Sequence, residues 1–480
     1  MSASRRLSAA DAAWLRMDRP TNLMVINSVL LFAEPVDWRR LKRIVQRRLI
    51  ERYPRFRERT VESRLPLLTP SWEPDPDFAL DHHLHHLALP DPGDTRALQE
   101  LLGELAAMPL DRARPLWSMY LLDGFQGGSA VIARMHHCIA DGIALAQVLL
   151  SLTDSHPGAP IDSTGHTAAP SSPATRWPAI AQPFLAGVSL SRRAVETVAE
   201  QGLAIATRPG HAVELAGALA NDAATALRLL LTPADAASAI KGAPGVTRHV
   251  AWTAPLPLQL VRQIAHDHDA TVNDVLLAAV SGALRRYLQR RGGAVGEIQA
   301  LVPFNLRPLD EPVPRELGNR FGLVYLPLPV GTSGGYRRLL AVHRRMDAIK
   351  RSRSGPVSYG LLSAVGMTPT RIERWIVDTL TGKSTAVMTN VPGPQKPVYL
   401  AGVPVRSVLV WAPTSGRVGM SVSVFSYHGE VTVGLMVDSA HVQDPETIVV
   451  QIERELRALA KLKPSARGAG RDGRARAASR

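Results

Sequence analysis

Two adjacent histidines, His136 and His137, are the residues in the sequence best suited to chemistry. They end an apolar run in the segment Val131–Gly142, which reads VIARMHHCIADG. Histidine titrates near neutral pH, so it can accept a proton from a hydroxyl group during an attack and release it afterwards. A place at the end of a strand would hold the imidazole still. The pattern indicates a fixed general base, although a histidine pair without any function is the more usual meaning of so short a pattern.

The acidic residue of this segment is expected to be structural. Asp141 is poorly placed to be a second base, and we expect it to pair with an arginine and lock the loop, with Arg307 as the candidate. Gly142, which follows it, would let the backbone come close to another segment or adopt a positive φ. The next helix is predicted to open here.

Metal binding is the main competing interpretation of the histidine pair. Adjacent residues at the end of a strand point to opposite sides, so His136 and His137 are not expected to reach one ion. No Glu or second His lies at helical spacing to complete a zincin-type set. We therefore predict no metal site.

Two other short patterns could carry chemistry. The segment Gly331–Gly335 fits G-x-S-x-G, with Asp378 and His428 downstream, which outlines a serine hydrolase. Such short matches are often accidental, and this one would leave HHCIADG unexplained. The segment Asp81–His86, DHHLHH, suggests a metal, but alternate residues of an extended segment face opposite sides. We favour a solvated loop there.

Composition bounds the class of protein. The chain has 480 residues, enough for two to four domains or two large lobes. Its 45% apolar and 20% charged residues predict a sizeable core and exclude wholesale disorder. The single cysteine, Cys138, excludes a disulfide scaffold and a cysteine-rich metal centre.

The positive charge is concentrated at the C-terminal end. The chain carries a formal net charge of +14, of which Lys461–Arg480 contributes +6. This Arg/Ala/Gly tail is predicted to be disordered; it could touch anionic lipid or simply keep the protein in solution. Aromatic residues are only 5% and are not interleaved with basic runs, so we expect no nucleic-acid partner.

No segment reads as a targeting signal or a membrane span. Asp11 and Arg16 interrupt any apolar region after Arg5 and Arg6, and no run of eighteen apolar residues occurs. The expectation is a cytoplasmic protein that contacts a membrane or lipid droplet peripherally, if at all.

Hydrophobic periodicity predicts an α/β texture in both halves. Strands are expected at 23–32, 117–122, 130–135, 300–306, 322–330, 387–391, 405–411, 419–425 and 431–437, and helices at 36–53, 98–108, 143–153, 258–267, 273–290, 336–352 and 445–461. Between the halves, 155–178 has linker composition and 179–240 is Ala/Leu-rich and helical in pattern. The predicted organisation is an N-terminal lobe at 1–154, a connector at 155–245, a C-terminal lobe at 246–460 and a basic tail at 461–480.

Several separated motifs resemble one known family. HHCIADG matches the HHxxxDG signature of the coenzyme A-dependent acyltransferase superfamily, which includes chloramphenicol acetyltransferase-like enzymes and condensation domains. Further segments resemble, in order, the motifs of the bacterial wax ester synthase/diacylglycerol acyltransferase family: Pro115-Leu116-Trp117, TVNDVLLAAVSGALRRYL with Asn273-Asp274, VPFNLRP at Val302–Pro308, LGNRFG at Leu317–Gly322 and TNVPGP at Thr389–Pro394. The opening LSAADAAWLRMDRPTNLM is also similar, so the resemblance covers about residues 7 to 460.

The resemblance implies a fold and a reaction. Two chloramphenicol acetyltransferase-like lobes would enclose an active-site tunnel, with acyl-CoA entering from one mouth and a diacylglycerol or fatty alcohol from the other. His137 would be the general base and His136 a packing or loop-holding residue. Acyl-CoA would be a substrate, and no cofactor is expected.

The same resemblance suggests supporting roles for the other motifs. Asn273 would orient the site or meet the oxyanion, or else be an N-cap, and Asp274 would lie in the first helical turn. Pro115 and Trp117 would fix a strand, and the turn with Thr389, Asn390 and Gly393 would line the tunnel. The alternatives are a condensation-type transferase of the same fold and a non-catalytic lipid-surface protein; the acceptor, chain length and oligomeric state stay open.

Overall fold

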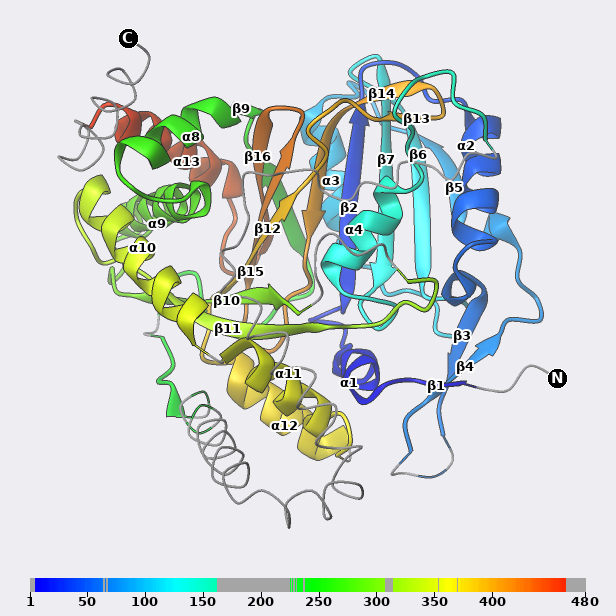
Figure 1. Cartoon of the computed structure of the whole chain (residues 1–480), viewed down its shortest axis with the longest axis horizontal. Coiled ribbons are helices and arrows are strands. Elements are labelled where there is room, and N and C mark those ends of the chain that lie inside the picture. The colour runs from blue at the N-terminus through cyan, green and yellow to red at the C-terminus, as the bar shows by residue number, and fades with distance from the viewer. Residues whose placement is uncertain are drawn as a thin grey trace, which may run out of the picture.

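The computed structural model describes residues 5–161 and 225–462, except positions 64, 66, 67, 226, 228, 230, 236, 237, 307–313, 353 and 369. These residues form two α/β lobes side by side, each built on a mixed sheet (Figure 1), which confirms the predicted fold class. Most of the predicted connector, 155–245, and of the predicted tail, 461–480, lies outside the described residues.

The first lobe is built on a six-stranded sheet that carries the histidine pair. Its strand order is β13-β14-β2-β7-β6-β5. The strands are β2 (Val25–Phe32), β5 (Leu84–Ala88), β6 (Trp117–Phe125), β7 (Gly128–His136), β13 (Tyr399–Leu400) and β14 (Val403–Trp411). Every residue of β2 and β7 is buried, which agrees with their nearly continuous apolar sequences.

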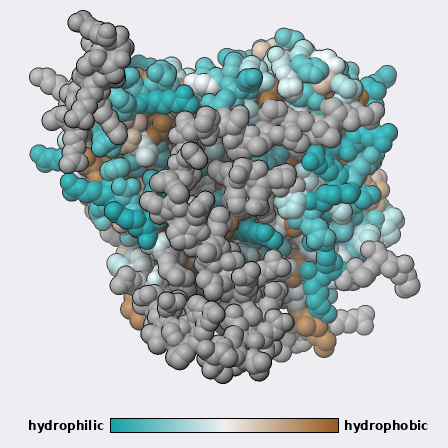
Figure 2. All heavy atoms as spheres, viewed as in Figure 1, coloured by the Kyte–Doolittle hydropathy of each residue, from teal (hydrophilic) through white to brown (hydrophobic). Residues whose placement is uncertain are grey.

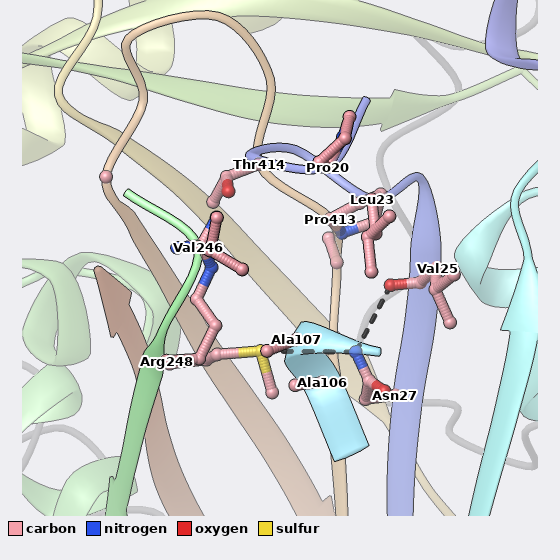
Figure 3. Close-up of a pocket in the computed structure, with 13 residues that line it drawn as sticks. Pro20, Leu23, Val25, Asn27, Ala106, Ala107, Val246, Arg248, Pro413 and Thr414 are labelled. Atoms are coloured by element: carbon pink, nitrogen blue, oxygen red, sulfur yellow. Dashed lines mark hydrogen bonds between the residues drawn. The ribbon is translucent and has the colours of Figure 1, made fainter. Parts of the chain in front are cut away.

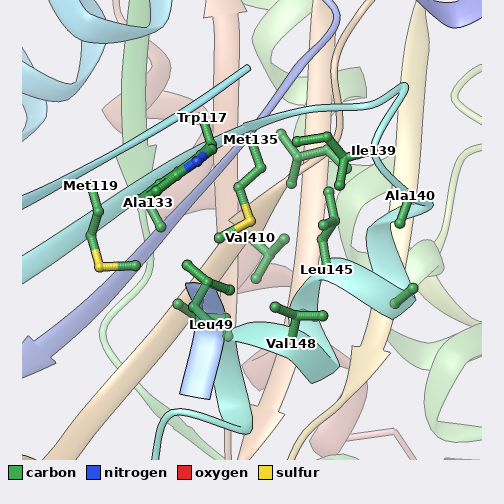
Figure 4. Close-up of a cluster of buried hydrophobic side chains, with 14 of the residues drawn as sticks. Leu49, Trp117, Met119, Ala133, Met135, Ile139, Ala140, Leu145, Val148 and Val410 are labelled. Atoms are coloured by element: carbon green, nitrogen blue, oxygen red, sulfur yellow. The ribbon is translucent and has the colours of Figure 1, made fainter. Parts of the chain in front are cut away.

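Helices cover one face of this sheet. They are α2 (Trp38–Ile44), which continues as a π-helix over Val45–Ile50, and α4 (Gly142–Leu150). Figure 4 shows Leu145 and Val148 of α4 facing Trp117 and Met135 of the sheet, with Leu49 of the π-helix beside them. The loop that carries the histidines, between β7 and α4, is therefore fixed at both ends by packed apolar side chains.

The second lobe is built on a larger mixed sheet. Its strands are β8 (Arg248–Trp252), β9 (Leu256–Pro257), β10 (Ile298–Asn305), β11 (Phe321–Leu328), β12 (Ala386–Pro392), β15 (Met420–Tyr427) and β16 (Glu430–Asp438). The order is β11-β10-β12-β15-β16-β8, with β9 beside β16, and β12 runs parallel to both of its neighbours. Four amphipathic helices pack on it: α8 (Leu258–Asp267), α9 (Val272–Arg290), α10 (Gly335–Arg351) and α13 (Pro445–Ala460).

One strand of the C-terminal half belongs to the first sheet. Strand β14 pairs antiparallel with β2 along its length, for example Val408 opposite Leu30 and Val410 opposite Ser28. The range 246–460 that the sequence assigns to the C-terminal lobe therefore contributes β13 and β14 to the other lobe. The division of the chain in sequence is not the division of the sheets in space.

Helix α3 (Thr95–Ala107) forms part of the core that joins the lobes. Its apolar side chains are buried against residues from both sheets, including Val250 of β8, Trp411 of β14 and Met436 of β16. A shared core of this kind fixes the relative position of the lobes, since separating them would expose apolar surface.

The remaining elements surround the seam between the lobes. Three short strands, β1 (Arg5–Arg6), β3 (Glu58–Val61) and β4 (Ser71–Pro74), form a small sheet in the order β1-β4-β3. Helix α1 (Ala9–Met17) follows β1 in the chain, and α11 (Ser354–Val365) and α12 (Thr370–Thr381) pack against it. Short 3-10 turns occur at Pro54–Arg57 and Leu80–His82. Among the described residues, no helix is both long and apolar enough to cross a membrane.

Candidate active site

The histidine pair is held by the backbone of two other segments. The N–H of His136 donates to the carbonyl of Leu116 at 2.9 Å, and the N–H of His137 donates to the carbonyl of Met24 at 2.7 Å. The Pro115–Trp117 motif and the start of β2 therefore flank the histidines directly. The rigid mount predicted at the end of a strand is present.

His137 packs against two aromatic rings, which also contact each other. Its imidazole is stacked on Trp14 of α1, with centroids 4.1 Å apart, and Phe321 of β11 lies 5.3 Å away on the other lobe. The residue is only 4% exposed. Its contacts thus come from both lobes, which is where the resemblance placed the reaction.

Asn319 fixes the tautomer of His137. The amide nitrogen Nδ2 of Asn319 donates to the Asp11 carboxylate at 2.7 Å and to the His137 carbonyl at 2.8 Å. This orientation leaves the amide oxygen facing Nδ1 of His137 at 2.9 Å. An amide oxygen only accepts, so Nδ1 must carry the hydrogen and Nε2 the lone pair. Within the described part of the chain, no hydrogen bond occupies that Nε2.

Burial sets the protonation of this group. Desolvation lowers the pKa of His137 to about 4, outweighing the hydrogen bonds to its own backbone and to Asn319, which favour the charged form. The imidazole is therefore neutral at physiological pH and able to accept a proton. Burial also raises the pKa of Asp11 above its usual value, although hydrogen bonds from Asn319 and Ser8 oppose that shift.

His136 is turned to a different environment. Its Nδ1 accepts the backbone N–H of Cys138 at 3.1 Å, and its Nε2 lies 3.7 Å from a carboxylate oxygen of Asp18. The same Asp18 oxygen accepts the N–H of Met24 at 2.7 Å. These contacts hold the loop together, as expected of a loop-holding residue.

Asp141 joins the two lobes through hydrogen bonds from backbone groups. One of its carboxylate oxygens caps α4 by accepting the N–H of Ala144 at 2.9 Å, and the other accepts the backbone N–H of Arg320 at 3.2 Å. Arg307, the predicted partner, lies outside the described residues. The loop lock predicted for Asp141 is thus made through backbone groups.

Neither the positive φ nor the close backbone approach expected at Gly142 is observed. Its φ is not positive, because it is the first residue of α4 and has helical geometry. A Cβ built there would meet its nearest neighbour, Ile26, at 3.9 Å, an ordinary contact distance. That part of the prediction was wrong.

The Asn273-Asp274 motif lies on α9 in the second lobe. Thr271, and not Asn273, is the N-cap, in a capping box with Asp274, so the N-cap alternative for Asn273 was wrong. Asp274 is in the first turn as predicted, where it also accepts from His343 at 2.8 Å. The Asn273 side chain accepts from Asn390 of β12 at 3.1 Å. Two predicted residues thus meet here, in a group separate from the His137 contacts.

The other predicted positions are structural in their contacts. Trp117 donates to the Phe56 carbonyl at 3.0 Å inside the core. Gly393 follows β12, and a Cβ there would lie 2.4 Å from the Phe425 ring. The Thr389 hydroxyl is buried without a hydrogen-bond partner in the described residues.

Two adjoining cavities lie beside this site. The inner one is formed between β2, the end of α3, the segment before β8 and the segment after β14 (Figure 3). The outer one extends from it past Asp18, the carboxylate beside His136. Neither is lined by His137 itself, whose ring is covered by Trp14 and Phe321. The predicted tunnel to His137 stays a prediction.

The two competing patterns do not assemble a site. Ser333 is exposed in the loop before α10, and no histidine in the described residues is hydrogen-bonded to it. In DHHLHH, His83 is buried and stacked on Trp117, whereas His85 stacks on Tyr120 and His86 pairs with Asp123. Across the described chain, no group of three His, Cys, Asp or Glu side chains could hold a metal. The solvated loop expected there was wrong, because the segment forms a 3-10 turn followed by strand β5 and buries His83.

Sequence reasoning missed Asp11, Trp14, Asn319 and Phe321 as parts of the site. All four lie in segments that resemble the family, LSAADAAWLRM and LGNRFG, but nothing in either segment by itself indicates a contact with a histidine. Asn319 is 182 positions from His137 along the chain.

Comparison with known sequences identifies related proteins. The chain matches the wax ester synthase/diacylglycerol acyltransferase catalytic domain over residues 7–276 and the C-terminal domain of the same family over residues 317–460. A Mycobacterium tuberculosis H37Rv protein named probable diacylglycerol O-acyltransferase tgs1 is 30% identical over 406 residues, 83% of each chain. A second protein of that strain, also named a diacylglycerol O-acyltransferase, is 29% identical over 462 residues, which are 91% of this chain and 86% of that one.

Solved structures share the fold. The wax ester synthase/diacylglycerol acyltransferase from Marinobacter aquaeolei VT8 superposes with a TM-score of 0.65 at 20% identity, over 95% of this chain and 100% of that one. The first condensation domain of the CDA synthetase superposes with a TM-score of 0.58 at 17% identity, over 96% of each chain. These similarities cover both lobes.

Proposed function

Since the chain belongs to the wax ester synthase/diacylglycerol acyltransferase family and is an acyltransferase, we propose that it transfers a long-chain acyl group from acyl-CoA to the hydroxyl of a diacylglycerol or a fatty alcohol. The diacylglycerol acceptor is supported by the names of its mycobacterial relatives. The observation that carries the proposal is the neutral His137, whose Nδ1 is tied to Asn319 and whose Nε2 is left as a base.

The proposed reaction is a direct attack. Nε2 of His137 takes the proton of the acceptor hydroxyl as its oxygen attacks the thioester carbonyl, giving a tetrahedral oxyanion. Collapse of this intermediate breaks the carbon–sulfur bond, releases the ester and expels the CoA thiolate, which recovers the proton from His137. A positioned base of this kind contributes about 10²–10⁴-fold to the rate. We propose Asn273 as a candidate for orienting the site or meeting the oxyanion, through the amide N–H groups that its contact with Asn390 leaves unused.

Replacing the base tests this mechanism. His137→Ala is expected to lower the release of CoA thiol from long-chain acyl-CoA by about 10²–10⁴-fold, with either diacylglycerol or a fatty alcohol as acceptor. Ser333→Ala is the matched control, because it removes the alternative nucleophile and should leave turnover unchanged. Near-normal turnover by His137→Ala would eliminate the mechanism, and activity with carrier-tethered but not CoA-linked donors would favour the condensation-type alternative.

Contact with a lipid surface is a separate part of the proposal. On α12 and just before it, Trp375, Ile372 and Met367 are 69%, 50% and 63% exposed, and Arg371 is exposed beside them. An exposed tryptophan next to a cation suits an anionic lipid surface. The proposed role of the basic tail 461–480 has the same electrostatic basis.

Sedimentation with anionic vesicles tests the surface. Trp375→Ser and deletion of residues 461–480 should each weaken association, whereas vesicles without charged lipid should bind less throughout. Unchanged sedimentation of both variants would refute the lipid contact. Equal lipid binding with and without His137, with no CoA release by either protein, would instead support the non-catalytic alternative.

A further inference from the structure

The outer cavity beside the histidine loop is rich in arginine. It has a volume of about 440 Å³ and lies between the segment after α1, the end of α3 and helix α12. Three arginines line it, namely Arg19, Arg112 and Arg374, against a single carboxylate, Asp18. Three guanidinium groups from three separate segments thus converge on one cavity.

Most of the hydrogen-bond donors of these arginines are uncommitted. Arg19 pairs with Asp378 through one nitrogen at 3.0 Å, and Arg112 uses one nitrogen for the Leu15 carbonyl and Asp18. Arg374 has no hydrogen bond or ion pair within the residues that the structure describes. Each guanidinium carries five N–H donors in a planar fork that matches phosphate geometry. The cavity can therefore bind an anion without breaking its existing ion pairs.

The inner cavity continues from this cationic end and is much smaller, with a volume of about 20 Å³. Both cavities share Pro20, Leu23, Ala107 and Val246 in their walls. Beyond the shared part, the inner wall mixes apolar side chains such as Val25 and Ala106 with the polar Asn27, Arg248 and Thr414, as Figure 3 shows. The three arginines Arg19, Arg112 and Arg374 thus lie in the larger of the two cavities.

One segment that lines both cavities, at Leu23, also holds the candidate base His137. Met24, between Leu23 and Val25, accepts the backbone N–H of His137 and donates its own to Asp18. Val25 lies opposite His136 in the pairing of β2 with β7. A ligand in these cavities therefore lies against the backbone that positions the catalytic loop.

We infer that Arg19, Arg112 and Arg374 bind the phosphate groups of the acyl-CoA donor in the outer cavity. The inference rests on the proposed function and extends it to named residues. The three arginines would recognise a phosphate ester, and a phospholipid headgroup is the other molecule that could present one. Arg374 is the clearest probe, because its replacement breaks no ion pair.

Kinetics with two donors tests the inference. Arg374→Gln should raise the KM for a long-chain acyl-CoA by about tenfold, the loss expected for about 1.4 kcal/mol of binding energy, and leave kcat within about twofold. The KM for the same acyl group on pantetheine, which has no phosphate, should not change. Arg262→Gln, an exposed arginine of α8 outside both cavities, is the matched control. Equal effects on both donors, or no effect on either, would overturn the assignment.

Binding without turnover separates this inference from the proposed function. Calorimetry with desulfo-CoA should show weaker binding by Arg374→Gln than by wild type. If wild-type protein binds desulfo-CoA through Arg374 but never transfers an acyl group, the phosphate site is supported and the proposed function is refuted. Loss of vesicle binding with unchanged affinity for desulfo-CoA would overturn the assignment and identify a lipid headgroup as the ligand.

Discussion

Asn319 decides which nitrogen of His137 can act as a base. Free imidazole has two tautomers, and only one of them presents a lone pair at Nε2. The contacts of Asn319 with Asp11 and with the His137 carbonyl fix the direction of its amide, so the tautomer follows from a chain of hydrogen bonds between the lobes. Asn319 is thus a positioning residue for the proposed reaction.

Replacing Asn319 should affect the rate more than the affinity. Asn319→Ala would let His137 adopt either tautomer and would remove one of the donors to the buried Asp11 carboxylate, while the backbone N–H of residue 319 would still donate to it. We expect kcat to fall by about 10²-fold, the lower part of the range for a general base, with KM within a few-fold. The readout is kcat and KM for acyl-CoA, with circular dichroism as the check on folding. A changed KM with an unchanged kcat would contradict a positioning role.

The lowered pKa of His137 predicts the pH dependence. In the proposed mechanism the neutral imidazole is the active form, and burial keeps it neutral down to a pKa of about 4, so kcat/KM should be nearly constant from about pH 5.5 to 8. In the unfolded chain the same histidine binds a proton below about pH 6.5. Stability should therefore be lost as the pH falls from about 6.5 towards 4, and this loss should be smaller in His137→Gln. An activity limb near pH 6.5 that belongs to His137 would contradict the burial argument.

At this scale the sequence predicted the base but not its partner. The histidine pair can be recognised from the sequence because both residues lie in one short motif at the end of an apolar strand. Asn319 is a polar residue in a loop, and its contact with His137 exists only because the second lobe brings that loop to the first. Hydrogen-bond partners so far apart in sequence leave no local periodic signal.

Among the elements, those with a strong apolar pattern were predicted closely. The helix expected at 273–290 is α9, Val272–Arg290, and the strand expected at 431–437 is β16, Glu430–Asp438. Helices α1, α11 and α12 were not predicted. In α1 and α11 small residues interrupt the stripe, and α12 mixes a buried carboxylate with an exposed tryptophan. Helix α1 does carry a local signal, since the Ser8 side chain caps it and four of its nine residues are alanine.

Glu373 on α12 is a buried carboxyl group at this seam. It is fully buried, and its oxygens have no hydrogen-bond partner in the described residues, although Arg16 of α1 lies 3.7 Å away. Desolvation raises its pKa to about 7, because Arg16 compensates for the loss of water only in part. The folded protein therefore keeps a proton on Glu373 at pH values where the unfolded chain has released it.

The free energy of unfolding should fall as the pH rises towards the pKa of Glu373. The unfolded carboxyl group ionises near pH 4.5, so the contribution of Glu373 to stability is lost as the pH rises from about 4.5 through 7. Glu373→Gln removes the titration and should be more stable than wild type at pH 8, with little difference at pH 5. Urea unfolding at both pH values measures this. An equal effect of the substitution at pH 5 and pH 8 would exclude the titration as its cause.

For the whole molecule, the sequence predicted two lobes but not the strand that one lobe gives to the other. Hydrophobic periodicity marked 405–411 as a strand, yet periodicity carries no information about which sheet a strand joins. Strand β14 pairs with β2, and its Trp411 is buried in the core shared by both lobes. Neither lobe is therefore a self-contained unit.

Separating the two halves should show this dependence. Residues 1–200 expressed alone would lack β14 and expose the edge of β2, so we expect an aggregated product. Co-expression with residues 201–480 should restore solubility and acyl-CoA turnover, measured after the two fragments are purified together. A soluble, cooperatively unfolding fragment 1–200 would contradict the dependence.

Strand β14 also has a consequence for biosynthesis. A ribosome makes the chain from its N-terminus, so β2, β6 and β7 leave the exit tunnel long before β14 is translated. During that interval the nascent chain carries the histidine loop on an unfinished sheet. The protein therefore becomes active only late in translation. Until then the edge of β2 is unpaired, and a chaperone would be needed to protect it.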